Sequence, residues 1–177
     1  MTNVRLRNIS YLCGKISVMA KEIERKFRVI NDSYVDMASE CHHIIQGYVS
    51  LRKEGTVRVR VKNDRAFLTV KGVNRGMERD EWEYPIPVSD ALEMLSSVTE
   101  GAVIDKHRYI VPFEGHKWEV DRFGGAYEGL VIAEVELLSA TESVTLPPFI
   151  GEEVTGDPRY YNSSLAAGRS SSGSNTI

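Results

Sequence analysis

Cysteine is scarce in this 177-residue chain, which contains only Cys13 and Cys41. Their separation matches no metal-binding spacing, and two cysteines do not make the disulfide framework of a small secreted domain. No apolar run reaches the length needed to cross a membrane. The net charge of −3 lacks the basic excess of a dedicated nucleic-acid binder. These absences predict a cytoplasmic protein that binds neither nucleic acid nor membrane.

The local motifs of several enzyme classes are also missing. The sequence has no Gly-rich phosphate-binding loop of the Walker type and no convincing nucleophile. Cys41 precedes His42 and His43, but adjacent residues on a strand point to opposite faces. His107 and His116 lack metal-ligand spacing, so we expect them to be structural or surface residues. Any phosphoryl chemistry would therefore rest on positioning, charge neutralisation and a metal-bound water.

The composition predicts one soluble globular domain, because 42% of the residues are hydrophobic and 27% are charged. Residues 1–18 carry two arginines before a short apolar patch that Gly14 and Lys15 interrupt, which makes a poor signal peptide. We expect this stretch to be a dispensable extension, with Met19 as a candidate alternative start. Residues 19–168 form the predicted domain. Residues 169–177 are low in complexity and are expected to be disordered.

Alternation of apolar and polar residues with period two dominates the chain and predicts a mainly β protein. A helix is expected over 89–98, with Ser89 as its N-cap, and a short C-terminal helix over 160–168. Eight mainly antiparallel strands indicate a barrel or a tightly curved sheet. The predicted strands lie near residues 20–29, 42–51, 55–63, 66–72, 78–88, 102–112, 116–122 and 130–138.

Charged residues recur two apart, so that whole strand faces are ionic. In "TVRVRVK" (56–62), the basic residues share one face and the valines share the other. Taken alone, this is an ordinary half-buried strand with a solvated basic face. The pattern recurs, however, at Glu22/Glu24, Arg58/Arg60, Glu81/Glu83, Lys106/Arg108, Glu119/Asp121 and Glu134/Glu136, with Lys71 ending "FLTVK" and Arg79 in phase with Glu81.

Like charges placed side by side on a strand repel one another, so such faces need compensation. Carboxylate clusters bind hard divalent cations, and clustered Arg and Lys bind phosphate oxygens. We therefore expect the ionic faces to point into one barrel that holds a polyanion with its metal ions. The apolar faces must then point outward, to be covered by helices or by a partner chain. They would tolerate a homodimer without specifying one.

Taken in order, these residues resemble the CYTH superfamily, also called the triphosphate tunnel metalloenzymes. The opening signature Glu-x-Glu-x-Lys is present as Glu22-Ile-Glu24-Arg-Lys26. The resemblance covers residues 20–167, with one departure at Pro158, where a basic residue is expected. It implies an eight-stranded antiparallel β-barrel that forms a tunnel, with peripheral helices and a short C-terminal helix that plugs one mouth. The other segments that carry it are "VRVRVK", "FLTVKG", "RDEWEYPI", "IDKHRY", "WEVDRF", "LVIAEVEL" and "EEVTGDPRYYNSSLA".

The resemblance also implies roles for the charged residues. Mg²⁺ or Mn²⁺ would be held by Glu22, Glu24, Glu134 and Glu136, with Glu119 and Asp121 at or near a second position. Lys26 and Lys106 would face the reacting phosphates, and Glu81 and Glu83 would act beside them or support the second metal position. The phosphates would be gripped by Lys26, Arg58, Arg60, Lys71, Arg79, Lys106 and Arg108.

The chain resembles the short bacterial members of this family, which lack an appended helical domain and hydrolyse inorganic tripolyphosphate to pyrophosphate and phosphate. Other triphosphate chemistry in the same tunnel is an alternative: an adenylate cyclase, a thiamine triphosphatase or a nucleoside triphosphatase. Tyr48, Tyr109 and Trp118 could contact an organic group, but they are better explained as core or rim residues. A non-catalytic polyphosphate- or nucleotide-binding module is a further alternative. The carboxylates argue against it, because anion binding alone needs none.

Overall fold

The computed structural model describes residues 20–52, 54–73 and 78–168, and the predictions for residues 1–18 and 169–177 lie outside this part. The described chain is mainly antiparallel sheet. None of the described helices is long and apolar enough to cross a membrane. The elements are β1 (Ala20–Val29), α1 (Tyr34–Met37), β2 (Glu40–Arg52), β3 (Gly55–Lys62), β4 (Arg65–Lys71), β5 (Glu78–Ile86), α2 (Val88–Ser97), β6 (Glu100–Phe113), β7 (His116–Phe123), β8 (Val131–Glu136), β9 (Ile150–Glu153) and α3 (Asn162–Ala166), with 3₁₀ turns at Gly125–Tyr127 and Pro158–Tyr160.

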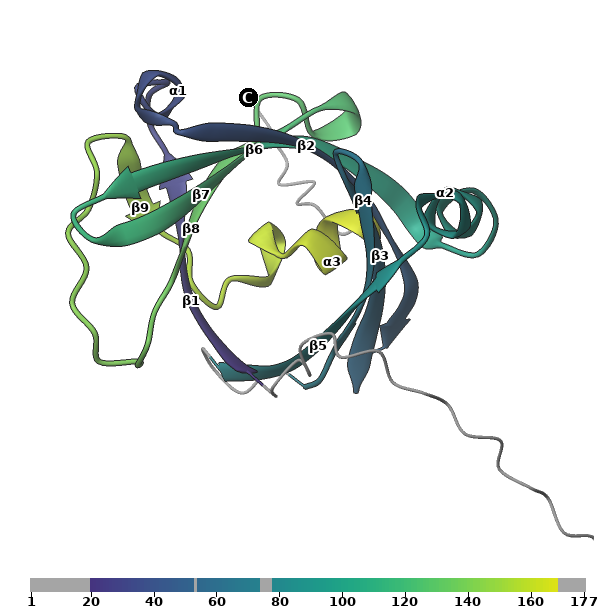
Figure 1. Cartoon of the computed structure of the whole chain (residues 1–177). Coiled ribbons are helices and arrows are strands. Elements are labelled where there is room, and N and C mark those ends of the chain that lie inside the picture. The colour runs from purple at the N-terminus through teal and green to yellow at the C-terminus, as the bar shows by residue number, and fades with distance from the viewer. Residues whose placement is uncertain (1–19, 53, 74–77, 169–177) are drawn as a thin grey trace, which may run out of the picture.

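Eight strands form a ring in the order β5-β4-β3-β2-β6-β7-β8-β1 (Figure 1). The strand β1 closes it, because its residues Ala20–Ile23 pair with β5 while Glu24–Arg28 pair with β8. All of these pairings are antiparallel. The predicted eight-stranded barrel is therefore confirmed. The ninth strand, β9, was not predicted; it pairs with the end of β1 at Phe27 and Val29.

The predicted elements match the structure closely in position. The hairpin between β3 and β4 turns at Asn63, whose φ of 52° is one that asparagine tolerates better than most residues. The helix α2 starts one residue before the predicted start, after Pro87, so Ser89 is not its N-cap. The short helix α1 was not predicted. Four residues are too few to show a helical repeat in the sequence.

The apolar strand faces point out of the barrel, as predicted, and are covered there. The helix α2 lies outside the ring (Figure 1) and packs Ala91 and Leu95 against Val59 and Val61 of β3. These valines alternate with Arg58, Arg60 and Lys62 along the same strand, so the basic side chains point inward. Because the valines are buried on the outer face, the charged side chains that alternate with them must point into the barrel.

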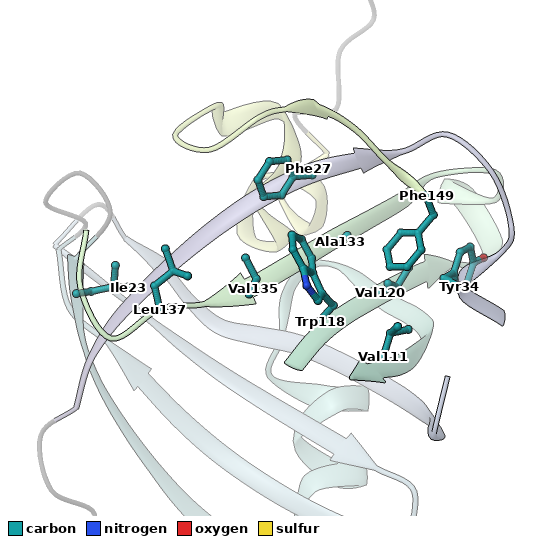
Figure 2. Packing of buried hydrophobic residues seen from close by; sticks show 10 residues of the cluster. All are labelled: Ile23, Phe27, Tyr34, Val111, Trp118, Val120, Ala133, Val135, Leu137 and Phe149. Atoms are coloured by element: carbon teal, nitrogen blue, oxygen red, sulfur yellow. The ribbon is translucent and has the colours of Figure 1, made fainter. Parts of the chain in front are cut away.

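A second apolar cluster covers the opposite side of the barrel (Figure 2). Trp118 and Val120 of β7 pack with Phe27 of β1, and the ring centroids of Phe27 and Trp118 are 5.6 Å apart. Phe149, which precedes β9, and Tyr34 of α1 complete the cover, with ring centroids 6.0 Å apart. Trp118 is therefore a core residue, as expected. The segment after β8 owes its course to this packing.

The helix α3 lies within the ring when the barrel is viewed along its axis (Figure 1). Leu165 and Ala166 are buried against Tyr48 and Ile104 on the inner face. The hydroxyl of Tyr127 donates a hydrogen bond to the Leu165 carbonyl. The predicted C-terminal plug is therefore present and anchored by apolar contacts at one end of the barrel.

Candidate active site in the barrel interior

The inward faces of the strands surround a cavity of about 280 Å³. Its walls come from β1 to β8 and from the segment that leads into α3. Seven basic and six acidic side chains line it among the described residues, so the ionic faces do share one space. The lining residues are Glu24, Lys26, Ile44, Tyr48, Thr56, Arg58, Arg60, Lys62, Lys71, Glu81, Glu83, Arg108, Lys117, Glu119, Glu134, Glu136, Thr155, Gly156, Tyr161, Asn162 and Ser163.

Lys26 of β1 and Glu134 of β8 are paired across the strands and form an ion pair inside the cavity. The Lys26 ammonium also lies 3.6 Å from a carboxylate oxygen of Glu24. Its Nζ lies 5.8 Å from the centre of the Tyr161 ring, in a cation–π contact. Lys26 is thus held between two carboxylates on one side and the plug segment on the other.

Arg108 of β6 is the centre of the ionic network on this wall. Its Nε and Nη2 donate to Asp121 at 2.6 Å each, and its Nη1 pairs with Glu119. The Nη2 also donates to Glu134 at 3.1 Å. Because carboxylates surround it, the pKa of Arg108 is raised well above its ordinary value, against the opposing effect of burial. Asp121 and Glu119 have lowered pKa values, since the charge of Arg108 outweighs the burial that would raise them.

Lys106 lies deeper, beneath the plug, with a side chain only 1% exposed. Its Nζ donates to Asp121 at 2.5 Å and to the Asn162 side-chain oxygen at 3.2 Å. Burial lowers the pKa of Lys106 to about 8, because Asp121 is shared with Arg108 and cannot offset the desolvation. Lys26 is equally buried, yet its pKa is raised, because Glu134 and Glu24 outweigh the desolvation.

Glu134 shows the reverse effect of the same contacts. Burial would raise its pKa, but the charges of Lys26, Arg108 and Lys106 hold the pKa well below the ordinary value. The carboxylate is therefore ionised throughout the physiological pH range. The like-charge repulsion expected from the sequence is offset by cations on neighbouring strands, and not by ligands alone.

The opposite wall, from β3, β4 and β5, carries a second network. Arg60 donates to Glu83 at 2.7 Å, and the Thr69 hydroxyl donates to the same oxygen at 2.9 Å. Arg58 donates to the Thr69 hydroxyl at 3.1 Å. Burial and the neighbouring charge of Arg58 lower the pKa of Arg60 to about 10, so it is still a cation at neutral pH. Lys71 pairs with Glu81 at 2.6 Å.

Most of the predicted site residues line the cavity. Lys106 and Asp121 instead lie behind its wall, buried against each other and under Asn162. The backbones of Glu22 and Arg79 are paired between β1 and β5. Their side chains lie outside what the structure describes. The predicted residues on the cavity wall are Glu24, Lys26, Arg58, Arg60, Lys71, Glu81, Glu83, Arg108, Glu119, Glu134 and Glu136.

Several lining residues were not among the predicted site residues. Lys62 is in phase with Arg58 and Arg60, and Lys117 is in phase with Glu119, so the period-two pattern could have identified both. Asn162 and Tyr161 carry no such signal, because the plug segment reaches the cavity only through the tertiary fold. The surface assignment of His107 holds: it is exposed and stacks on His43, with ring centroids 5.0 Å apart.

The carboxylates of the cavity suit a hard divalent cation by their chemistry, since Mg²⁺ and Mn²⁺ prefer oxygen ligands. Glu24 and Glu136 are paired directly between β1 and β8. Glu134 lies two residues before Glu136 on β8, on the same face of the strand. In the described part of the chain, no three His, Cys, Asp or Glu side chains are gathered into a preformed metal site. Lys26 and Arg108 hold Glu134, so a metal ion would draw it away from these partners.

Comparison with known proteins assigns the chain to a family. The sequence profile of the CYTH domain matches residues 20–162. An inorganic triphosphatase of Acetivibrio thermocellus is 52% identical over 147 residues, which cover 83% of this chain and 94% of that protein. An inorganic triphosphatase of Nitrosomonas europaea is 38% identical over 149 residues, covering 82% and 96%. The crystal structure of an inorganic triphosphatase has a TM-score of 0.59 at 35% identity, covering 84% of this chain and 96% of that one. These matches confirm the resemblance inferred from the sequence: the chain belongs to the CYTH domain family.

Proposed function

We propose that this chain hydrolyses inorganic tripolyphosphate to pyrophosphate and phosphate, with Mg²⁺ or Mn²⁺ as cofactor. The observation that carries the proposal is the cavity, which seven basic and six acidic described side chains line together. Two relatives, 52% and 38% identical, are inorganic triphosphatases, and both are matched over nearly their whole length. A linear triphosphate fits this charge pattern because its oxygens can meet basic groups from several strands, including β1, β3, β4 and β6.

The basic residues bind and orient the phosphates. Arg58 and Arg60 are held in place by Thr69 and Glu83, so their guanidinium groups are already ordered when substrate arrives. Lys26 and Arg108 face them from the opposite wall. Positive groups on both sides neutralise the charge that builds up on the phosphate oxygens during transfer.

A metal cofactor follows from the balance of charge. The acidic residues nearly cancel the basic ones, so the cavity alone is a weak match for a polyanion with several negative charges. Glu24, Glu134 and Glu136 would hold the cation, together with Glu22, which precedes Glu24 by two residues on β1. A bound Mg²⁺ or Mn²⁺ supplies charge neutralisation and activation of water. Asp121, which is held by Arg108 and Lys106, would serve to keep those two cations in place.

The reaction breaks the bond between the terminal phosphorus and the bridging oxygen. Water attacks that phosphorus in line, and pyrophosphate leaves with the bridging oxygen and its electron pair. Glu81 and Glu83 line the wall that holds Arg58 and Lys71, and we assign to this pair the base, one of whose carboxylates accepts the proton that the attacking water loses. The basic residues stabilise the pyrophosphate as it leaves.

The test is phosphate release from tripolyphosphate with Mg²⁺, with Mn²⁺ and with a chelator, beside ATP, thiamine triphosphate and pyrophosphate. Glu134→Gln removes one carboxylate charge from the cavity and should lower the rate on the order of 100-fold or more. Glu93→Gln is the matched control, because Glu93 is exposed on α2, outside the barrel, and should leave the rate unchanged.

Fast release that needs the metal and prefers tripolyphosphate supports the proposal. Turnover of ATP or thiamine triphosphate alone would contradict the inorganic substrate while retaining the tunnel. Tight binding of tripolyphosphate without turnover would contradict the hydrolase and indicate a binding module. Undiminished activity of Glu134→Gln would remove Glu134 from the proposed metal site.

A further inference from the structure

Asn162 is the first residue of α3, and its side chain lines the cavity. The segment before Asn162 is bonded to β1 through Glu153 and Thr155, several residues earlier in the chain. Arg25 makes a bidentate pair with Glu153, and the Thr155 hydroxyl accepts a hydrogen bond of 3.0 Å from the Lys26 backbone N–H. These contacts bring the start of α3 to the inner wall at a fixed point.

The Asn162 amide has a defined orientation. The Lys106 ammonium donates to the Asn162 Oδ1 at 3.2 Å. An ammonium group has only donors, so it must face the carbonyl oxygen and not the NH₂ group of the amide. The Nδ2 is therefore the amide atom that Lys106 does not contact, and Asn162 is one of the residues that line the cavity. Lys106 cannot reverse its own position, because it is buried and also donates to Asp121.

We propose that Asn162 is a substrate-binding residue whose side-chain NH₂ donates to a phosphate oxygen, and that Lys106 is the positioning residue that orients it. The proposal rests on the proposed function. Lys106 is too buried to line the cavity in this structure. It acts on the cavity indirectly, by orienting the Asn162 amide that does line it. The positive charge behind the carbonyl polarises the amide and strengthens its N–H donors.

The contacts that anchor α3 do not involve Asn162, so Asn162 can be substituted while α3 stays in place. Leu165 and Ala166 are buried in an apolar cluster, and Tyr127 bonds the Leu165 carbonyl. None of these contacts uses the Asn162 side chain. A substitution at Asn162 should therefore leave the helix docked, and changes in substrate binding can be read directly.

The variant Asn162→Asp keeps the shape of the side chain and an oxygen for Lys106, but it replaces the donor with an acceptor. We expect the KM for tripolyphosphate to rise by about 10- to 100-fold, with a small change in kcat, because a charge-assisted donor is lost. The melting temperature should not fall, because Lys106 retains its partner. Ser164→Asp is the control: it adds the same charge to the same helix at a residue outside the cavity lining, and KM should be unchanged.

If Asn162 only holds Lys106 in place, Asn162→Asp will match the parent enzyme in KM, and the proposal is overturned. Should the Asp variant fail to fold, Asn162→Ala serves instead, with an expected rise in KM of about 10-fold and an unchanged KM as the contrary result. Calorimetric titration with pyrophosphate measures the same loss without turnover. If the parent protein binds these anions but does not hydrolyse tripolyphosphate, the proposed function fails while this binding test still stands.

The positioning role of Lys106 is tested by a double-mutant cycle. Lys106→Met removes the hydrogen bond that orients the Asn162 amide. It should therefore raise KM in the parent but add little to KM in the Asn162→Ala background. Fully additive effects would show that the two residues act independently and would overturn the positioning role.

Discussion

Arg108 holds Asp121 with two hydrogen bonds of 2.6 Å, one from Nε and one from Nη2, in the interior of the barrel. Lys106 donates to the same carboxylate at 2.5 Å. One buried aspartate is therefore shared by two buried cations, although Arg108 also pairs with Glu119 and Glu134. Loss of this shared negative charge should be costly, because buried charges destabilise a fold unless they are paired.

Asp121→Asn should destabilise the fold by about 3 to 5 kcal/mol, since it leaves Lys106 and Arg108 buried without their shared counter-charge. Glu119→Gln removes the same charge from the same strand, but its side chain is 25% exposed and should cost about 1 kcal/mol or less. Urea unfolding of the two variants gives the comparison. Equal losses would show that Asp121 has no special role.

Thr69→Val should lower kcat/KM about 10-fold, because the Thr69 hydroxyl links Arg58 to Glu83 and so orients the guanidinium. Thr69 is fully buried behind the cavity wall, so the effect would be indirect. Steady-state kinetics with tripolyphosphate measure it. Thr99→Val is the matched control: its hydroxyl bonds the Leu95 carbonyl beside α2, and kcat/KM should be unaltered. An unaffected Thr69→Val enzyme would mean that Arg58 needs no such support.

The barrel and its inner face could be predicted because each strand carries its own evidence. In "TVRVRVK", the valines favour an apolar environment and the cations need polar or charged partners, so the two faces separate within the strand itself. Because the pattern recurs on most of the eight expected strands, we expected the ionic faces to meet in one interior. The fold class and most cavity residues follow from this local pattern.

The plug segment and the ionic partnerships could not be predicted in this way. The pairing of Arg25 with Glu153 joins residues 128 positions apart, and nothing local indicates it. The register of β1 against β8 places Glu134 opposite Lys26, and that register is a tertiary property. For this reason the carboxylates were expected to face ligands, whereas several of them also neutralise buried cations. Asn162 was missed because its position depends on the course of the whole segment.

The stability of the protein should rise with pH between about 8 and 10.5 through Lys106. Burial lowers the pKa of Lys106 to about 8, whereas its ordinary value is 10.5. Between these values the unfolded chain binds the proton and the folded chain has released it, so rising pH favours the folded state. Below pH 8, Lys106 is protonated in both the folded and the unfolded state, so it no longer makes stability depend on pH.

Urea unfolding of the parent and of Lys106→Met at pH 7 to 9.5 isolates this effect. The difference in unfolding free energy between the two proteins should shift in favour of the parent as the pH rises. Other groups titrate in both proteins and cancel in the difference. A constant difference across this range would show that Lys106 keeps its ordinary pKa.

Gly101 connects the β6 strand to the plug through a close backbone approach. Its φ is +74°, and a Cβ placed there would lie 2.1 Å from the Ala166 carbonyl oxygen of α3. Gly101→Ala should therefore push α3 off its docking site, lower the melting temperature and raise the KM for tripolyphosphate. Gly115→Ala is the matched control, because Gly115 has a φ of +82° and nothing within 4 Å of an added Cβ. It bears the same backbone strain of about 1 to 2 kcal/mol without the clash, and should leave KM unchanged. If Gly101→Ala loses more stability than Gly115→Ala but leaves KM unchanged, a docked plug is not required for substrate binding, and equal losses would show that the clash does not displace α3.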